Sequence, residues 1–417
     1  MKNWGRFGVA AALLIALAAV LQWNGVKAAG GPAQGEGGPY RVLAPIVSGN
    51  LLLFPVVRAD GKFTGETPFI TLDEGLKSGE VEVTEAGRAR GLVRPRGSAN
   101  PPAPSETYRG DEVNTLVLVN HSKHPLLLLA GEIVTGGKQD RIVAKDRIVP
   151  PDADPIDLGV FCIEPGRWTE SSATFGVAGK SAARSFMVQP EVRERAMVDQ
   201  DQQQVWNSVN GAISQMEVAA APPVGSGGSA PGGLYRRSLG TSSYAKAMQD
   251  SGVSEKVDEA AAPVMNAREQ VLAQLRDEHA VGVVVAVRGE IIWADLFANT
   301  DLLSRYWTKL VRSYAAESLT EGDDHPAATV ADAQHFLDAP SGGTENSEGE
   351  VGIYRYRELK SSGTETFVLE SLLPGTGYDV HLSKMKLRGE ESRTVKPYPT
   401  NQPPRYRPDV YSPEIVR

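Results

Sequence analysis

The stretch Gly131-Glu-Ile-Val-Thr-Gly-Gly-Lys-Gln-Asp-Arg-Ile-Val-Ala-Lys-Asp-Arg-Ile-Val-Pro-Pro151 lies between two runs that are rich in β-forming residues. It holds four basic and three acidic side chains, and its Gly-Gly pair predicts a tight turn. The basic excess contrasts with the formal net charge of the chain, which is −8. A positive glycine bend in an acidic chain predicts a site for an anion.

The runs on both sides of this bend predict antiparallel strands. Residues 114–119 and 126–134 flank a polar turn and predict a hairpin. The glycine bend then leads into a strand over 142–149, and another strand is expected over 156–163. Earlier in the chain, further strands are predicted over 40–47, 50–57 and 81–84, with a short helix over 72–77.

Helical periodicity begins after Pro190. Residues 191–206 predict a charged helix, and the apolar positions of 257–275 predict a second one that Pro263 kinks. The clearest helix covers 302–314, where apolar residues repeat at intervals of three and four. Its N-cap is Asn299 or Thr300.

The strand pattern returns around and after that helix. Residues 281–287 and 290–297 flank Arg288-Gly289, which is typical of a two-residue hairpin turn. Residues 339–350 predict an acidic loop, and strands follow over 351–358, 364–369 and 377–383. The predicted fold class is therefore α+β, mainly antiparallel β-sheet, sandwich or barrel-like, with a few packed helices.

The N-terminus predicts export. Lys2 and Arg6 precede an uninterrupted apolar run over 9–21, and residues 26–28 have the small-residue spacing of a signal-peptidase site. The run is 13 residues long, shorter than the roughly 20 that a spanning helix needs. We therefore expect a signal peptide at 1–28, a periplasmic or extracellular protein and no stable membrane span after cleavage; a retained anchor is the alternative. Cleavage removes three basic residues and no acid, so the net charge falls from −8 to −11, which disfavours nucleic acid as a partner.

The rest of the chain predicts one large domain over 40–384. Residues 219–233, rich in Ala, Pro, Gly and Ser, predict a disordered insert. Residues 396–417 form a Pro/Tyr-rich tail that is expected to be extended and could contact a protein partner. Cys162 is the only cysteine, so the chain has no internal disulfide.

The glycine bend is the candidate ligand-binding site. Gly136 and Gly137 can adopt positive φ and present backbone amides to an anion, and nearby basic side chains add charged donors. The alternative is a tight hairpin whose charges pair in solvent. The candidate ligand-binding residues are Gly136, Gly137, Lys138, Gln139, Asp140, Arg141, Arg167 and Trp168.

Evidence for catalysis is thinner. Glu132, Asp140 and Glu164 are weak candidates for a general base, if they converge in space. A buried structural Cys162 is favoured over a nucleophile. The six histidines are scattered, so no metal site is expected, and no dinucleotide-binding fingerprint or other cofactor motif is present.

Several separated motifs occur in a characteristic order: Gly131 to Arg141, Val149-Pro-Pro151, Val160-Phe-Cys-Ile-Glu-Pro-Gly-Arg-Trp168, residues 283–295, and Tyr306-Trp-Thr-Lys-Leu-Val-Arg-Ser-Tyr314. Together they resemble the ARPP domain family, named for its association with ADP-ribosylglycohydrolase and rhodanese-phosphatase-like proteins. The resemblance covers roughly residues 40–383. It implies a link to ADP-ribose or phosphorylated nucleotides and no established activity.

Three functions are therefore expected from the sequence. The first is binding of an anionic or phosphorylated small molecule, possible partners being nucleotide-derived compounds. The second is hydrolysis of a nucleotide or ADP-ribose-like substrate. The third is a non-catalytic structural or interaction role in the cell envelope. The sequence leaves open whether the protein is an enzyme.

Overall fold

The structure is a computed structural model that describes residues 38–59, 67–86, 116–167, 170–179, 181, 184–221, 238–265 and 268–388. The predicted signal peptide and the predicted tail lie outside these residues. Of the predicted insert, only 219–221 are described, and they form the end of a helix and the residues that follow it.

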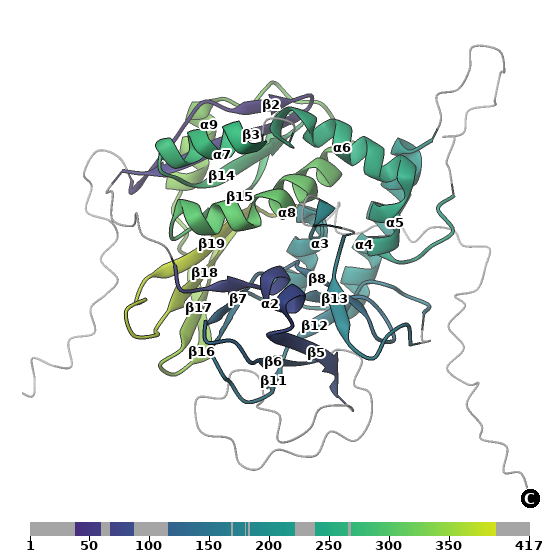
Figure 1. The fold of residues 1–417 in the computed structure, drawn as a ribbon. Helices are drawn as coiled ribbons and strands as arrows, with labels where there is room; N and C mark the ends of the chain where they lie inside the picture. Colours follow the sequence, from purple (N-terminus) through teal and green to yellow (C-terminus); the bar gives the residue numbers. More distant parts are fainter. Residues whose placement is uncertain are drawn as a thin grey trace, which may run out of the picture. The chain divides into compact units, whose positions relative to one another are not determined.

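A nine-stranded antiparallel sheet is the largest element of the fold (Figure 1). Its order is β1-β3-β14-β15-β19-β18-β17-β16, and β2 also pairs with β3. Three of its strands come from residues 40–58 and six from residues 280–386. The strands are β1 (Tyr40–Val42), β2 (Ile46–Ser48), β3 (Leu51–Arg58), β14 (Ala280–Val287), β15 (Glu290–Phe297), β16 (Thr344–Glu350), β17 (Tyr354–Ser361), β18 (Thr364–Ser371) and β19 (Asp379–Lys386).

The middle of this sheet is buried on both faces, because side chains on a strand alternate in direction. Leu53 and Val283 share one apolar cluster with residues of α6, α7 and α8. Their neighbours Phe54 and Val284 share another with Ala333 of α9. These helices are α6 (Ser251–Met265), α7 (Arg268–Asp277), α8 (Thr300–Ser318) and α9 (Val330–Asp338).

Residues 70–177, here called the β-rich segment, form three smaller sheets with a core of their own. Leu126 and Leu128 face that core, whereas Leu127 and Leu129 between them join the cluster that contains α8. The segment comprises β4 (Ile70–Thr71), α2 (Leu72–Ser78), β5 (Val81–Glu85), β6 (Leu116–Asn120), β7 (Leu126–Leu128), β8 (Ile133–Gly136), β9 (Arg141–Val143), β10 (Arg147–Val149), β11 (Ile156–Asp157), β12 (Val160–Cys162) and β13 (Phe175–Val177).

The α+β class is confirmed, but the pairing predicted within the β-rich segment is partly wrong. The expected hairpin of 114–119 with 126–134 does not form: β6 pairs with β5 and β11, whereas β7 pairs with β10 and β4. Asn120 explains the divergence, since its amide nitrogen donates to the carbonyls of His124 and Pro150 at 2.9 and 3.0 Å and holds the turn to another loop.

Two predicted strands are each divided between sheets. Residues 142–149 split into β9 and β10, and residues 156–163 split into β11 and β12. Residues 156–163 keep apolar side chains at alternate positions across their break, and residues 142–149 are apolar at both ends, so neither run marks the change of sheet. Among the described residues the four sheets are open, so the barrel-like alternative is not realised.

Elements defined by local signals agree better with prediction. Asn299 caps α8 by accepting a hydrogen bond from the Leu302 amide at 3.0 Å. Arg288 and Gly289 both have positive φ, 51° and 80°, and join β14 to β15 as expected. The acidic loop predicted over 339–350 is instead largely strand β16, because pairing with β17 supplies the hydrogen bonds that its sequence does not suggest.

The charged helix predicted over 191–206 is interrupted. It consists of α3 (Pro190–Glu194), a π-helical turn η3 (Arg195–Asp199) and α4 (Gln202–Ala219), with a break at Gln200. A short helix, α5 (Tyr244–Gln249), precedes α6. The second helix, predicted over 257–275, consists of two elements, α6 and α7, and Pro263 lies inside α6.

Arg193 and Asp295 form an ion pair that has no exposure to solvent, joining α3 to β15. The two guanidinium nitrogens lie 2.8 and 3.1 Å from the two carboxylate oxygens. Tyr314 and Ser383 also donate to this carboxylate, at 2.5 and 2.8 Å. Burial opposes ionisation of Asp295, but Arg193 and then His381 hold the pKa of that carboxyl well below its usual range.

The β-rich segment is attached to this ion pair through Ala130 and through Asp146 of the stretch 131–151. Arg193 Nε donates to the Ala130 carbonyl at 3.1 Å. Asp146 accepts the Ala130 amide at 2.7 Å and contacts His381 Nδ1 at 2.6 Å. His381 Nε2 lies 3.2 Å from Asp295, so the imidazole of β19 sits between two carboxylates.

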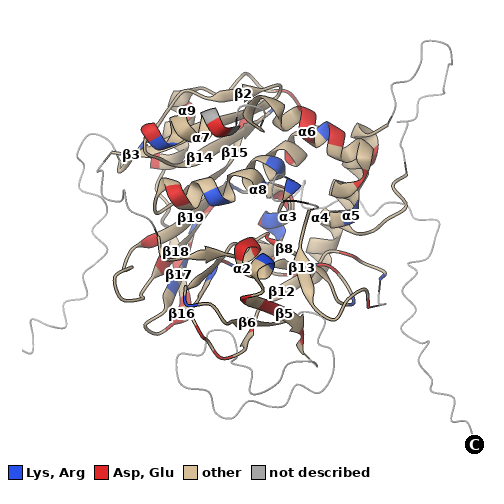
Figure 2. Ribbon diagram, in the orientation of Figure 1, with Lys and Arg blue, Asp and Glu red and all other residues tan. Residues whose placement is uncertain are grey.

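A second buried cation, Lys309 of α8, binds the same part of the chain. Its ammonium pairs with Glu132 and lies 2.7 Å from Asp73 of α2. Figure 2 shows the basic segments of α8 and the acidic segment of α2 that this contact brings together. Burial opposes the charge on Lys309, but the two carboxylates raise its pKa.

Gly131 is required where Arg193 crosses the chain. Its φ is +89°, and a Cβ there would lie 2.5 Å from Arg193 Cγ. We expect Gly131→Ala to lower the free energy of unfolding by about 3 kcal/mol or more, from backbone strain and overpacking together. Urea unfolding measures the loss. Gly352→Ala is the control, because its φ is +74° in open space; equal losses in both variants would contradict the packing argument.

His381 makes stability depend on pH. Burial alone lowers the pKa of the imidazole, but Asp146 and Asp295 outweigh it and raise the pKa to about 9. Its stabilisation is complete below the unfolded-state pKa of about 6.5 and is lost as pH rises through 9. We expect the stability gap between the parent and His381→Asn to shrink by about 3 kcal/mol between pH 6 and 9.5, in urea unfolding. A gap that stays constant would show that folding does not raise the pKa of this histidine.

Candidate functional site

The glycine bend connects β8 to β9 as predicted, with φ of +136° at Gly136 and +50° at Gly137. Its backbone amides already have acceptors within the protein. The Gly136 amide donates to Asp140 Oδ1 at 3.1 Å. The Gly137 amide donates to Ser172 Oγ at 3.2 Å, and the Lys138 amide to Glu85 Oε1 at 3.0 Å. An anion would have to displace these groups.

Arg167 binds the other side of the bend. It donates to the Gly137 carbonyl at 3.0 Å and to the Gly136 carbonyl at 3.4 Å. Its Nε donates to Glu164 at 2.7 Å, and Asp140 lies 3.5 Å away. Trp168, the other residue predicted beside it, lies outside the described residues. Arg167 therefore lies against the bend, with two carboxylates as partners.

Asp140 and Glu164 are the two candidate bases that the structure brings together. Asp140 also accepts from Ser243 at 2.9 Å, and Glu164 pairs with Lys246 at 2.8 Å. Burial, and next the charge of Glu164, raise the pKa of Asp140. These contacts tie the bend to α5 and to the residue that caps it.

The remaining residues of the bend are mostly inside the protein. Arg141 is 2% exposed, and its guanidinium donates to the Gln139 carbonyl at 2.7 Å. The Gln139 side chain is fully buried, and its amide has no hydrogen-bond partner among the described residues. Lys138 is half-buried. The ligand-binding role of the bend stays a prediction.

Glu132 and Cys162 are the other two residues considered for chemistry, and both are fully buried. Glu132 is held by Lys309 and accepts the Leu129 amide at 2.9 Å. Cys162 is fully buried on β12, and burial raises the pKa of its thiol to about 11. A thiol of that pKa is a poor nucleophile near neutral pH, which agrees with a structural cysteine.

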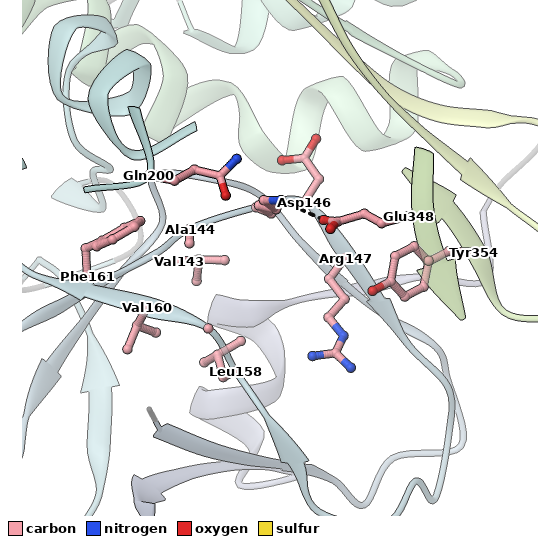
Figure 3. A pocket seen from close by; sticks show the side chains of 13 residues that line it. Val143, Ala144, Asp146, Arg147, Leu158, Val160, Phe161, Gln200, Glu348 and Tyr354 are labelled. Carbon is pink, nitrogen blue, oxygen red and sulfur yellow. Dashed lines mark hydrogen bonds and ion pairs between the residues drawn. The ribbon is translucent and has the colours of Figure 1, made fainter. Parts of the chain in front are cut away.

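A cavity of about 390 Å³ lies away from the glycine bend, between the β9–β10 turn and strands β16 and β17 (Figure 3). This volume is within the range of small-molecule sites. One part of the wall is apolar and the other carries charged and amide groups. The lining residues are Val143, Ala144, Lys145, Asp146, Arg147, Leu158, Gly159, Val160, Phe161, Gln200, Glu348, Gly349 and Tyr354.

The three charged residues of the β9–β10 turn have different partners. Asp146 is fully buried and pairs with His381. Arg147 pairs with the buried Glu350 and donates to the Asp157 carbonyl at 2.6 Å, and in Figure 3 its guanidinium points away from Glu348. Lys145 pairs at 2.8 Å with Glu348, whose side chain is 53% exposed on edge strand β16. Solvent therefore reaches the partner of Lys145 and not those of its neighbours.

The sequence singled out residues 131–151, which contain the β9–β10 turn, but it gave no sign of the cavity. Lys145 and Glu348 are 203 residues apart, and no local pattern links them. Gln200 gave no sequence signal either, because it was expected inside a continuous helix. The described residues contain no group of three or more His, Cys, Asp or Glu side chains placed to hold a metal. Among the helices that are described, none combines the length and apolarity needed to cross a bilayer.

Comparison with known proteins identifies a family and gives no closer guide to function. No curated protein matches the chain, and no solved structure matches it. The family model for the ARG and Rhodanese-Phosphatase-superfamily-associated Protein domain, ARPP-1, matches residues 39–385. This match spans the whole nine-stranded sheet except the last residue of β19, together with the β-rich segment. The chain therefore belongs to the ARPP-1 family.

Proposed function

We propose that this protein binds an anionic small molecule in the cavity beside the β9–β10 turn, with Lys145 as the anion-binding residue. The observation that carries the proposal is the Lys145–Glu348 pair, in which a cation that lines a cavity is neutralised by a carboxylate that is half exposed. An incoming anion can take the place of Glu348 while that side chain turns into solvent.

The energetics favour this exchange. An exposed ion pair contributes only about 0–1 kcal/mol, so opening it costs little. The ligand then meets a cation whose surroundings are partly dry, where a charge-assisted hydrogen bond is stronger than in water. Exchange at Arg147 is much less favourable, because displacing the buried Glu350 would leave a carboxylate without solvent or a partner.

Binding is better supported than hydrolysis. The three candidate bases are engaged in ion pairs, Glu132 with Lys309, and Asp140 and Glu164 with Arg167. None of them lines the cavity. Two carboxylates line the cavity. The oxygens of Asp146 face the Ala130 amide and His381, and Glu348 is the group that the ligand would displace. We therefore propose a reversible binding protein. The glycine bend supports the site indirectly, because it leads into the strand that precedes Lys145.

We also infer that the protein is exported. The support is the sequence of residues 1–28, with its basic start, short apolar run and small-residue spacing. Mass spectrometry of the mature N-terminus in the native host tests the inference. The expected chain begins at Ala29; a chain that keeps the segment and sediments with membranes would support the anchor instead.

The binding proposal is tested by isothermal titration of the full chain with ribose 5-phosphate and inorganic phosphate. We expect Lys145→Gln to weaken binding of both probes about tenfold or more, because a charged hydrogen bond is lost. Glu348→Gln should strengthen binding, since it removes the competing carboxylate. Lys386→Gln is the control, because this lysine forms a similarly exposed pair with Glu290 outside the cavity.

Two results would contradict the proposal. One is a parent protein that shows neither heat of binding nor a thermal shift with any small anion at millimolar concentration. The other is a Lys145→Gln variant that binds the probes as tightly as the Lys386→Gln control does.

A further inference from the structure

Gln200 occupies a strained position at the edge of the cavity. Its φ and ψ are 50° and 33°, the left-handed region that disfavours residues with a Cβ. Its backbone amide closes the π-helical turn by donating to the Arg195 carbonyl at 3.1 Å. Asp201 then starts α4 by accepting the Gln204 amide at 2.9 Å. The chain thus ends one helix and begins another around this residue.

The fold itself does not require a glutamine here. Glycine adopts the left-handed conformation without steric cost and is the common residue at such helix ends. The Gln200 side chain is exposed, and its hydrogen bond to protein is a 3.3 Å contact with the Met197 carbonyl in the preceding turn. Strained backbone and π-helical turns are both concentrated at functional sites. The two features coincide here on a cavity wall.

The position of the carboxamide suggests what it does. Figure 3 shows the Gln200 side chain extending toward Glu348, with the Phe161 ring below it and Tyr354 beyond Glu348. A carboxamide both donates and accepts hydrogen bonds, which suits hydroxyl or amide groups better than a bare anion. Apolar side chains, including Val160 and Leu158, complete this part of the wall.

We propose that Gln200 is the specificity residue of the cavity and that the ligand is an organic anion, such as a sugar phosphate, rather than an inorganic ion. This inference rests on the proposed binding function. Lys145 takes the anionic group, and Gln200 hydrogen-bonds to polar groups on the carbon part of the same ligand. The retained backbone strain is then explained by ligand recognition.

The test compares two probes on Gln200→Gly. Isothermal titration of the full chain measures ribose 5-phosphate and inorganic phosphate, and urea unfolding measures stability. We expect the substitution to raise the unfolding midpoint, since glycine relieves the strain. It should weaken the binding of ribose 5-phosphate about tenfold, which is the effect of one lost hydrogen bond. The affinity for inorganic phosphate should not change. Asp152→Gly, also at positive φ (47°) but outside this cavity, should leave both affinities unchanged.

The outcomes separate the inference from the proposed function. The inference is wrong if Gln200→Gly binds ribose 5-phosphate as tightly as the parent does, or if it lowers the affinity for both probes equally. Gln200 then does not recognise the organic part of the ligand. In either case the proposed binding function still stands if Lys145→Gln abolishes binding of both probes. If Lys145→Gln loses neither probe, or the parent binds neither, the proposed function and the inference fall together.

Discussion

The buried ion pair between Arg193 and Asp295 is the interaction on which the rest of the structure depends. Removing two charges from water costs several kcal/mol per ion, and only close, saturated geometry offsets that cost. The pair achieves it with hydroxyl donors from Tyr314 and Ser383 and with the ring of Trp293, whose centroid lies 4.5 Å from the guanidinium. The polar centre of the molecule therefore has little freedom to rearrange.

Through this pair the nine-stranded sheet determines where the β-rich segment lies. Arg193 holds the Ala130 carbonyl, and the two carboxylates on either side of His381 belong one to each part. Lys309 adds an independent attachment at Glu132. Arg193, Asp146 and Lys309 all contact the turn formed by residues 129–132. Gly131 in this turn has no side chain, which leaves room for the arginine. The stretch 131–151 thus serves mainly to join the β-rich segment to the large sheet, and any role in binding a ligand comes second.

The β9–β10 turn connects that assembly to the cavity. Successive residues of the turn point in different directions: Asp146 faces inward to His381, while Lys145 reaches the acidic edge strand β16. The contacts of Asp146 therefore hold the backbone from which the Lys145 side chain extends. A cation held by a rigid neighbour is preorganised for a ligand, which reduces the ordering cost of binding. The glycine bend shows the opposite arrangement, because its amides are satisfied by the side chains of the protein itself.

The sequence by itself determined the features that depend on neighbours along the chain. These include the Asn299 cap, the Arg288-Gly289 hairpin, the turn at Gly136 and the burial of Cys162. The ordered motifs also sufficed to recognise the ARPP family. Such signals are legible because hydrogen bonds and φ preferences act over a few residues.

Only the tertiary structure decided which strands share a sheet and which charges meet. Asn120 diverted a predicted hairpin by bonding to a loop 30 residues away. Arg193 meets Asp295 across 102 residues, and Lys145 meets Glu348 across 203. Burial makes the Arg193–Asp295 contact specific, because an ion inside the protein is stable only beside its partner. No periodicity or motif in one sequence encodes that pairing, so the cavity and the strained Gln200 on its wall became visible only in the folded chain.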